Sequence, residues 1–344
     1  MSEQLSQLDI NPRITHALIK ANIKKFETVL SLSNPDIQRS TGLSSGDVSL
    51  LKKAVARAVP KLSCVSALDI WEEKCPTQLT LKKLTTGCKS IDEALRGGLL
   101  SHGITEISGE SSAGKTQLCL QLCLNVQLPF TLGGLSGGAA YICTEDVFPN
   151  KRLHQMIQYF SLKVNSLSSK IQYGDNIFIE HISDISGLKY CIQKRLPILL
   201  SKGDIKLVVV DSVASLFRCE YDQKDMVQRS KDLASMGACL HHLSNQYNIP
   251  VVCVNQVTDS MDAKDRHRKH IPSLGLTWSN QVTTRITLTR TNQHVTIPKH
   301  FINNLVIGGF ETCVRDLEII FAPHLPMLKL PCIIDQEGFK GWSC

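Results

Sequence analysis

The sequence predicts an α/β protein whose core is a mostly parallel sheet, preceded by a small all-α domain. Two observations carry this prediction. From about residue 81 onward, short continuous apolar runs rich in β-branched residues alternate with helical segments, as in a parallel sheet buried on both faces. Over residues 8 to about 60, apolar side chains recur at helical spacing instead. The chain has 344 residues, 42% of them hydrophobic, which is enough for one large domain and a small one.

Residues 1–60 are the predicted helical domain. Its apolar positions and helix starts are Ile14, Leu18, Ile23, Phe26, Leu30, Asn34 before Pro35, and Ser44 or Ser45 ahead of Asp47. The stretch STGLSS, residues 40–45, has two interpretations. It is either a helix-hairpin-helix turn whose glycine lets backbone amides approach a DNA phosphate, or an ordinary polar turn in a small bundle. A single glycine-containing turn favours the ordinary turn when taken alone.

Residues 61–80 are predicted to be a linker, because they have no clear period and contain Pro76. Residues 81–344 follow as the large domain. Its predicted strands are Ile104–Ser108, Ala139–Cys143, Ile177–Ile182, Leu207–Val210 and Val251–Val254. Helical segments separate these strands, which is the alternation that a parallel sheet requires.

Composition narrows the class of protein. No run of 18 apolar residues occurs, and the N-terminus lacks the features of a signal peptide, so we expect no membrane association. The 13 cysteines include no CxxC pair, and Cys119 and Cys123 lie one turn apart in a helix that is predicted to be core. We therefore expect reduced thiols rather than disulfides or a zinc site. The net charge of +7 is compatible with nucleic acid as a partner and does not require it.

The stretch GESSAGKTQ fits the phosphate-binding pattern GxxxxGK[ST], between a predicted strand and a predicted helix. A chance match somewhere in the chain has a probability on the order of one in a hundred. Glycines in such a loop let backbone N–H groups surround phosphates, the lysine reaches the β and γ oxygens, and the hydroxyl binds Mg²⁺. The predicted nucleotide-binding residues are Gly109, Glu110, Ser111, Ser112, Ala113, Gly114, Lys115, Thr116 and Gln117.

Three later strand ends carry polar groups that suit the same site. Asp211 ends the apolar run LVVVD and is a candidate acid for the metal. Glu145 follows another strand and is a candidate carboxylate for orienting the attacking water; Asp146 is the alternative, and both acids could simply be solvated. Asn255 and Gln256 end the run VVCV, where a neutral amide can respond to a γ-phosphate.

In this order, the motifs resemble those of the RecA-like strand-exchange recombinases, and among them the eukaryotic recombinase paralogues. The matching segments are TTGCKSIDEALRGGL, GESSAGKTQL, YICTEDVFPNKRL, LVVVDSVASLFRCEYD and VVCVNQV. The resemblance covers residues 8 to about 290, thins after that, and returns at APHLP and IIDQEGFKG. It implies a RecA-like P-loop ATPase core preceded by a helix-hairpin-helix-like domain.

The resemblance also implies roles for individual residues. The implied catalytic residues are Lys115, Glu145 and Gln256, and the implied metal residues are Thr116 and Asp211. Glu145 matches the catalytic carboxylate, and Gln256 matches the residue that couples the γ-phosphate to the DNA-binding loops. Arg152 matches a basic position beside the nucleotide pocket, and it joins Asp211 among the expected cofactor-binding residues. The implied cofactors are ATP and Mg²⁺.

Two loops are implied to face DNA, beginning near Arg218 and near Val257. The residues expected to contact DNA are Arg218, Arg229, Lys264, Arg266, Arg268 and Lys269. The second loop contains KDRHRKH, whose flexible cations suit a phosphate backbone. A solvated loop or a short import signal are the alternatives. No aromatic residue stands in this cluster to stack on bases.

The linker departs from the pattern of the active recombinases. Their linker carries Phe-x-x-Ala, which docks on a neighbouring subunit, whereas this chain has Cys64 in place of the aromatic and retains Ala67. A thiol buries less apolar area than Phe, a difference of roughly one to two kcal/mol at about 25 cal/mol per Å². Cys64 and Ala67 are therefore the expected partner interface, and a designated partner is favoured over a homofilament.

Together with the altered linker, the resemblance implies an ATP-binding accessory protein of homologous recombination repair of DNA double-strand breaks, with slow, DNA-dependent hydrolysis. The resemblance implies a heterodimer with another recombinase paralogue, the third-lettered one, that is, the third in the lettered series of these paralogues. It also implies the main eukaryotic recombinase and single-stranded and branched DNA as partners. Recombinase assembly, fork protection and Holliday junction processing are the implied tasks, in the nucleus and secondarily the cytoplasm. The alternatives are an autonomous DNA-stimulated ATPase that exchanges strands, and an interaction module without nucleotide.

Overall fold

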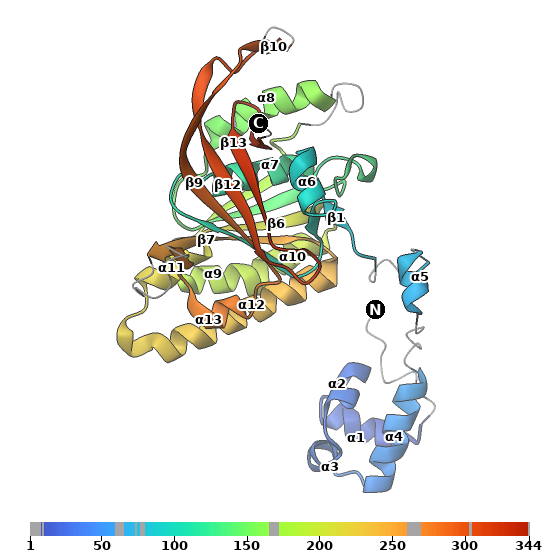
Figure 1. Ribbon diagram of the computed structural model, residues 1–344. Helices are drawn as coiled ribbons and strands as arrows, with labels where there is room; N and C mark the ends of the chain where they lie inside the picture. The colour runs from blue at the N-terminus through green and yellow to red at the C-terminus, as the bar shows by residue number, and fades with distance from the viewer. Residues whose placement is uncertain are drawn as a thin grey trace. The chain divides into compact units, whose positions relative to one another are not determined.

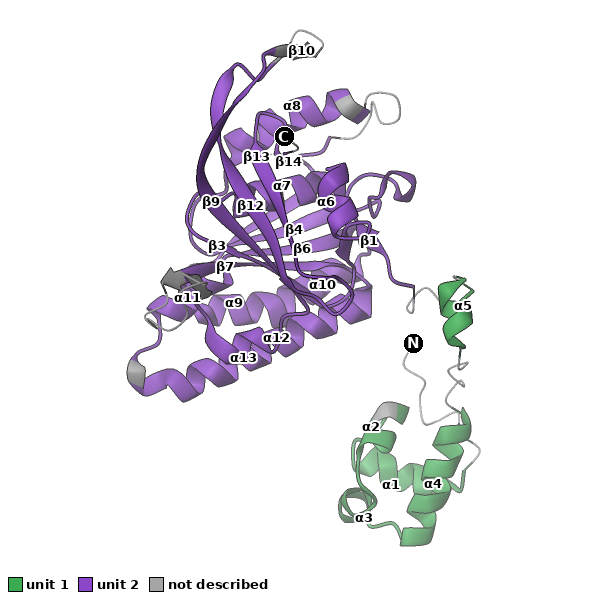
Figure 2. Cartoon of the chain, viewed as in Figure 1, with its two compact units in different colours: residues 1–79 green, residues 80–344 purple. Residues whose placement is uncertain are grey.

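The computed structural model describes residues 8, 10–58, 65–72, 74–75, 80–164, 172–259, 270–302 and 305–342. The chain divides into two compact units, residues 1–79 and residues 80–344 (Figure 2). No helix in these described ranges is long and apolar enough to cross a membrane. Each unit is described below by itself.

The described part of the first unit is helical (Figure 1). Its helices are α1 (Pro12–Lys20), α2 (Phe26–Ser31), α3 (Asn34–Thr41), α4 (Ser45–Ala58) and α5 (Ala67–Trp71). The start of α3 at Asn34 is as predicted, with Ser33 as its cap. Ser44 caps α4, because its Oγ accepts from the Asp47 N–H at 3.1 Å. Gly42 ends α3 at a φ of +71°, so a glycine makes the tight turn between the two helices.

The core of this unit is formed by buried side chains from α1 to α4. They are Ile14, Leu18, Ile23, Phe26, Val29, Ile37, Leu43, Val48, Leu51 and Val55. Leu30, which the helical spacing placed in the core, is instead 44% exposed, and Val29 is buried in its place. The chain turns between α1 and α2, so the helical period restarts at Phe26 rather than continuing from Ile14.

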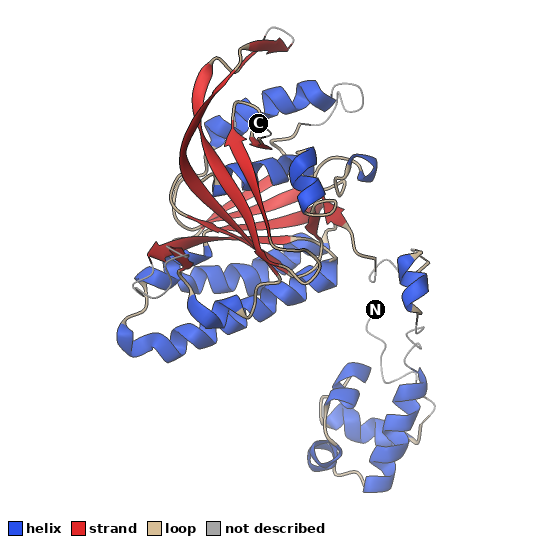
Figure 3. Ribbon diagram, viewed as in Figure 1, coloured by secondary structure: helices blue, strands red, loops and turns tan. Residues whose placement is uncertain are grey.

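The second unit is built on a ten-stranded sheet in the order β14-β13-β12-β9-β3-β7-β6-β4-β5, with β8 paired to β7 off this path. Figure 3 shows the strands of this sheet in red, with helices packed beside them in blue. Its parallel half comprises β3 (Ile104–Gly109), β7 (Val251–Asp259), β6 (Ile205–Asp211), β4 (Gly138–Cys143) and β5 (Ile177–His181). The predicted strands agree with these five to within a few residues at their ends. The order places β3 and its loop in the middle of the sheet.

Helices cover both faces of the parallel half. On one face lie α6 (Lys89–Ala94), α7 (Lys115–Asn125) and α8 (Asn150–Val164). On the other lie α9 (Ile185–Tyr190), the π-helical turn η3 (Cys191–Arg195), α10 (Leu196–Ser201), α11 (Val213–Cys219), α12 (Met226–Tyr247) and α13 (Gly275–Ser279). Alternate residues of a strand serve the two faces: Tyr141 of β4 belongs to the first core and Ile142 to the second. Two short 3₁₀ helices, η2 (Phe130–Leu132) and η4 (Gln223–Asp225), lie in the connections.

The other half of the sheet is antiparallel. It comprises β9 (Thr284–Ile297), β12 (Phe310–Phe321), β13 (Leu328–Ile334) and β14 (Phe339–Gly341), and β9 joins it to the parallel half by pairing in parallel with β3. The long strands β9 and β12 run on beyond the rest of the sheet toward β10 (Figure 1). The remaining strands are β1 (Lys83–Leu84), β2 (Leu99–Leu100), β8 (His270–Pro272), β10 (His300–Ile302) and β11 (Leu305–Ile307).

Candidate nucleotide-binding site

The GESSAGKT loop connects the carboxyl end of β3 to the first turn of α7. Gly109 and Gly114 have φ values of +153° and +107°. A Cβ on Gly109 would lie 2.3 Å from the Leu288 carbonyl oxygen, and one on Gly114 would lie 2.7 Å from Ile334 Cδ1. Only glycine fits both positions, because neighbouring strands pack directly against the loop. The loop therefore presents backbone N–H groups at the amino end of an eleven-residue helix, an arrangement that binds phosphate.

Lys115, the first residue of α7, is held against the loop that precedes it. Its Nζ donates to the carbonyl oxygens of Gly109 at 2.8 Å and Glu110 at 2.7 Å. An ammonium has three donors, so one remains for a phosphate oxygen. Desolvation of the partly buried ammonium lowers the pKa of Lys115, and the carboxylates of Asp211 and Glu145 oppose that shift. The negative charge of a phosphate beside Lys115 would oppose the shift in the same direction as these carboxylates.

Asp211, at the end of β6, accepts hydrogen bonds from two hydroxyl groups. Thr116 Oγ1 donates to its Oδ2 at 2.8 Å, and the Tyr141 hydroxyl donates to the same oxygen at 2.6 Å. Burial, together with the Asp211 carboxylate, raises the pKa of Tyr141 well above its usual value, so the phenol stays neutral and keeps donating. These contacts fix Asp211 beside the loop through its Oδ2. An oxygen set of this kind suits Mg²⁺, which prefers few protein ligands and keeps waters and phosphate oxygens.

Glu145, just after the end of β4, and Gln256, within β7, are in contact with each other. The Gln256 amide donates to Glu145 Oε1, and Ser212 Oγ donates to Glu145 Oε2 at 3.1 Å. Gln256 Oε1 in turn accepts from Arg218 Nη1 at 2.5 Å. The side chains thus form a continuous series from the acid at the phosphate site to Arg218, at the start of the first expected DNA loop. The structure places Glu145, rather than Asp146, in this series.

A cavity of about 570 Å³ brings the predicted phosphate residues and acids together. It is lined by residues of the phosphate-binding loop and by Tyr141, Cys143, Glu145, Asp146, Asp211 and Gln256, among others. Burial and the nearby Asp211 raise the pKa of Cys143 to about 12, which keeps its thiol neutral. Among the described residues, no group of three or more His, Cys, Asp or Glu side chains could hold a metal ion by itself.

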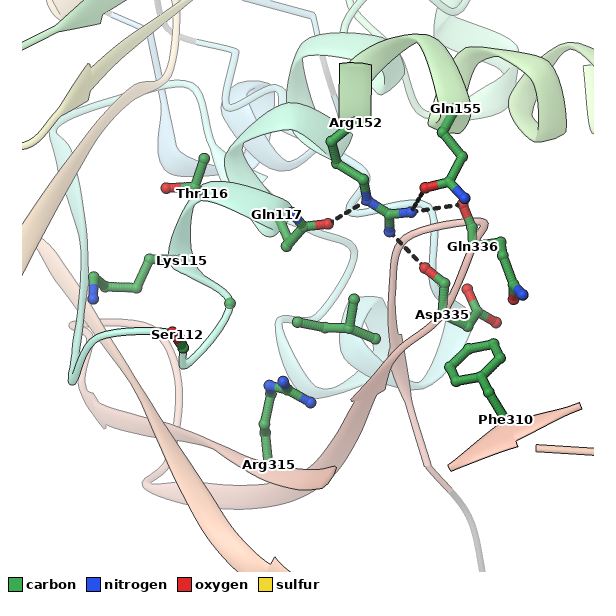
Figure 4. Close-up of a pocket in the computed structure, with 12 residues that line it drawn as sticks. Ser112, Lys115, Thr116, Gln117, Arg152, Gln155, Phe310, Arg315, Asp335 and Gln336 are labelled. Atoms are coloured by element: carbon green, nitrogen blue, oxygen red, sulfur yellow. Dashed lines mark hydrogen bonds between the residues drawn. The ribbon is translucent and has the colours of Figure 1, made fainter. Parts of the chain in front are cut away.

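A second cavity of similar volume, about 570 Å³, adjoins the first and shares Ser112, Lys115 and Thr116 with it (Figure 4). Arg152 of α8 lies on its wall. Arg152 donates to Gln117 Oε1 at 2.7 Å and to the carbonyl oxygens of Asp335 and Gln336 at 2.5 and 3.1 Å. Arg152 thus connects α7 to the turn between β13 and β14. Its place beside a bound nucleotide stays a prediction.

Sequence reasoning missed the residues that the antiparallel half brings to this second cavity. They are Phe310, Arg315, Ile334, Asp335 and Gln336. The last three lie in IIDQEGFKG, a segment noted for its resemblance without a role. Phe310 and Arg315 lie in the segment where the resemblance is thinnest, and no local motif marks them. Their position depends on the order of strands in the sheet.

The expected DNA and partner residues are less completely described. Arg218 is exposed, and Arg229 donates through Nε to the Phe217 carbonyl at 2.9 Å. Lys264, Arg266, Arg268 and Lys269 lie outside the described residues, as does Cys64. Ala67 is the first residue of α5 and is exposed. The contacts of these residues with DNA or a partner stay a prediction.

A phosphate-binding loop at the centre of a mostly parallel sheet, with acids at the neighbouring strand ends, defines a RecA-like nucleotide-binding protein. The Rad51 family profile matches residues 78–304, and the profile of the XRCC3/RpoA-like helix-hairpin-helix domain matches residues 5–59. The chain belongs to the Rad51 family. The second match confirms the helix-hairpin-helix domain, which the turn STGLSS alone had not favoured.

Full-length relatives agree with this assignment. DNA repair protein XRCC3 of Mus musculus is 42% identical over 349 residues, covering 98% of this chain and 97% of that protein. The Bos taurus protein of the same name is 42% identical over 344 residues, with the same coverage. DNA repair protein rhp57 of Schizosaccharomyces pombe is 30% identical over 352 residues, covering 92% of each chain.

Proposed function

We propose that this chain is an ATP- and Mg²⁺-binding accessory protein of homologous recombination repair of DNA double-strand breaks. The single observation that best supports the proposal is the series of contacts from Glu145 through Gln256 to Arg218. It gives the phosphate site a direct connection to the start of a loop that the family resemblance assigns to DNA. The relatives named DNA repair protein support the biological role.

The residues of the loop would bind the triphosphate. Backbone N–H groups of residues 110–114 surround the phosphates, and Lys115 supplies its third N–H to a phosphate oxygen. The Thr116 hydroxyl and Asp211 would hold Mg²⁺, which neutralises phosphate charge when bound. Because Thr116 and Asp211 are already bonded at 2.8 Å, little rearrangement is needed.

In this proposal, the binding of ATP controls the chain more than the hydrolysis of ATP does. Glu145 is the group that orients a water for attack, but its two oxygens are engaged by Gln256 and Ser212. A carboxylate held in this way is a poor base until the contact with Gln256 changes, so turnover is slow. A γ-phosphate that draws Gln256 away from Glu145 would alter Arg218 and thereby the DNA loop, which is a shift between two conformations.

We infer that the partner is a recombinase paralogue, the third-lettered one, in a heterodimer that assists the main recombinase on single-stranded and branched DNA in the nucleus. Helix α5 exposes Leu68, Ile70 and Trp71, the last at 85%. Three exposed apolar side chains on one short helix, next to Ala67, suit an interface that a partner covers. Recombinase assembly, fork protection and Holliday junction processing are the tasks that such a complex would serve.

The test is ATP binding and turnover by the full-length chain with its partner, with and without single-stranded DNA. Lys115→Ala removes a charged hydrogen bond and should raise the Kd for ATP about 10- to 100-fold. Lys151→Ala, an exposed lysine on α8, is the matched control and should leave the Kd unchanged. Glu145→Gln should lower turnover while ATP binding and partner binding persist.

Two outcomes would reverse the proposal. If turnover rises strongly with DNA and the chain alone forms long filaments in electron micrographs, the chain is an autonomous strand-exchange ATPase. If calorimetry with ATP and Mg²⁺ gives no heat for the wild-type chain, it is an interaction module that does not bind nucleotide.

A further inference from the structure

The first loop that is expected to face DNA, residues 220–225, connects α11 to α12. Its sequence EYDQKD carries three acids and one lysine, a net negative charge that a phosphate backbone would repel. The cations expected at DNA stand on either side of the loop, Arg218 near the end of α11 and Arg229 in the first turn of α12. DNA affinity should therefore depend on how the loop holds these two arginines.

Tyr221 attaches this loop to the helices on either side of it. Its ring stacks on Phe217 of α11, with the ring centroids 5.8 Å apart and the planes 9° from parallel. Its hydroxyl donates to Asp232 Oδ2 of α12 at 2.5 Å. Burial raises the pKa of Tyr221 and the hydrogen bond to Asp232 adds to the rise, so the phenol stays protonated and keeps donating at neutral pH. The loop is thus tied to both of the helices that it connects.

Asp232 is itself held by a third helix. Lys189 Nζ of α9 lies 2.6 Å from Asp232 Oδ1, and the aspartate side chain is only 11% exposed. Gln228 Nε2 donates to the same oxygen at 3.1 Å. The helices α9, α11 and α12 cover the same face of the sheet (Figure 1). Because both oxygens of Asp232 are engaged from different elements, the carboxylate gives the Tyr221 hydroxyl an acceptor in a fixed position.

Two further contacts fix the start and the far side of the loop. Glu220, the first acid of the loop, accepts at Oε1 from the Ile185 N–H at 2.9 Å, at the start of α9. Arg229 Nε donates to the Phe217 carbonyl at 2.9 Å. Phe217 directly precedes Arg218, so this bond holds Arg229 beside the turn of α11 that carries Arg218. The free chain therefore already has an ordered loop with its two flanking arginines close together.

We propose that Tyr221, Asp232 and Lys189 are positioning residues for DNA binding. They hold the loop in the conformation that presents Arg218 and Arg229 to a phosphate backbone. A segment that is ordered in the free chain loses less conformational entropy on binding than one that DNA must order. This inference rests on the proposed function, since it requires that this part of the chain binds DNA. It gives Lys189 an effect on DNA binding through Asp232, without contact to a phosphate.

The experiment measures the Kd for a fluorescent oligothymidylate by anisotropy, on the full-length chain with ATP and Mg²⁺, over a range of salt concentrations. Tyr221→Phe removes only the hydroxyl and should raise the Kd about fivefold. Lys189→Gln should raise it about threefold, while the slope of log Kd against log salt stays that of the wild type, because no phosphate contact is lost. Lys189→Arg keeps the charge beside Asp232 and should restore wild-type affinity.

Amide hydrogen exchange over residues 220–225 measures the ordering of the loop without DNA. Exchange should become at least about threefold faster in Tyr221→Phe and in Lys189→Gln. The Kd for ATP should stay within about twofold of the wild-type value, which reports that each variant is folded. Tyr190→Phe and Lys194→Gln are the matched controls, because both side chains are exposed, in α9 and η3, and they should change neither exchange nor the Kd for DNA.

Four outcomes would overturn this inference. Wild-type exchange in Tyr221→Phe would show that its hydroxyl does not order the loop. Faster exchange with an unchanged or tighter Kd for DNA would show that the ordered loop does not assist DNA binding, and would leave the ATP site of the proposed function intact. A smaller salt slope in Lys189→Gln would place Lys189 on a phosphate rather than on Asp232. A wild-type chain that binds ATP but no oligothymidylate would overturn this inference together with the DNA contact in the proposed function.

Discussion

The two halves of the large sheet line two adjoining cavities by different means. In the parallel half, the carboxyl ends of β3, β4 and β6 lie at one edge beside Gln256 of β7, so residues at or near these strand ends line the first cavity. In the antiparallel half, the second cavity is lined by side chains of β12 and by the turn between β13 and β14. Their position depends on which strand lies beside which. A site at parallel strand ends can therefore be predicted from short sequence motifs. A site on an antiparallel face depends instead on the order of the strands in the sheet.

Charged side chains at the junction of the two halves are buried, whereas those on the antiparallel surface are exposed. The junction of β3 and β9 contains a fully buried carboxylate, Glu106, paired with Arg285. Glu106 also accepts from Asn255 at 2.7 Å and Trp278 at 2.8 Å. On the antiparallel half, Lys329 bridges Asp316 and Glu318 from a 58% exposed position. Stability should therefore depend most on polar contacts at the junction and least on those at the antiparallel surface.

The largest effect is expected from Glu106→Gln at the junction. The change leaves the Arg285 guanidinium buried without its counter-charge, and breaking such a pair costs about 3–5 kcal/mol. Urea unfolding of the full-length chain, followed by far-UV circular dichroism, measures it. Glu93→Gln is the control, because Glu93 pairs with Lys89 at 3.9 Å on the surface and should contribute less than about 0.5 kcal/mol. Equal effects of the two changes would contradict the special role of the junction.

Gly114→Ala should come next, because Gly114 is where the antiparallel half touches the phosphate-binding loop. Its φ of +107° is unfavourable for alanine, and the new Cβ would meet Ile334 and the Phe339 ring. We expect a loss of about 2–3 kcal/mol, measured as a lower midpoint of thermal unfolding. Gly174→Ala, where no atom lies within 4 Å of the new Cβ, should change stability by less than about 0.5 kcal/mol. A tolerated Gly114→Ala would show that the two halves are only loosely packed here.

Asp232→Asn tests the helical cover of the parallel half. Burial alone would raise the pKa of Asp232, but hydrogen bonds from Lys189, Tyr221 and Gln228 outweigh it and hold the pKa below 3.8. The carboxylate therefore contributes stability above the unfolded pKa and loses it as pH falls through the folded pKa. We expect Asp232→Asn to cost about 1–2 kcal/mol at neutral pH, and the difference from wild type to shrink below pH 3.8.

Free energies of unfolding measured across the pH range check this expectation. Asp175→Asn, at an exposed aspartate, should track the wild type throughout. A difference for Asp232→Asn that stays constant down to the lowest pH would mean that its effect is steric rather than electrostatic.

The smallest effect is expected from Lys329→Gln on the antiparallel half. Asp316 and Glu318 raise the pKa of Lys329 through hydrogen bonds, yet the side chain is well exposed and solvent screens the pair. We expect a loss of about 0.5 kcal/mol or less, which should vanish at about 0.5 M salt. Thermal unfolding at low and high salt measures it, and a salt-independent loss above 1 kcal/mol would reverse the ranking of the two halves.

Residues close together in the chain were enough to predict the five parallel strands, the phosphate-binding loop and the acids Glu145 and Asp211. Each is a short motif attached to a strand end, and parallel strands bring such ends to one edge regardless of their order. The need for glycine at Gly109 and Gly114 could also be predicted from the local motif, since a phosphate-binding loop needs glycine wherever it occurs.

The tertiary structure decided the rest. It placed Gln256 and Ser212 within hydrogen-bond distance of Glu145, and it buried Val29 in place of Leu30 by restarting a helix at Phe26. It also brought Phe310 and Arg315 to a loop that lies about two hundred residues earlier in the chain. A strand carries no local signal of its neighbours, because pairing depends on the packing of the whole sheet. The antiparallel wall of the second cavity therefore became visible only in the folded chain.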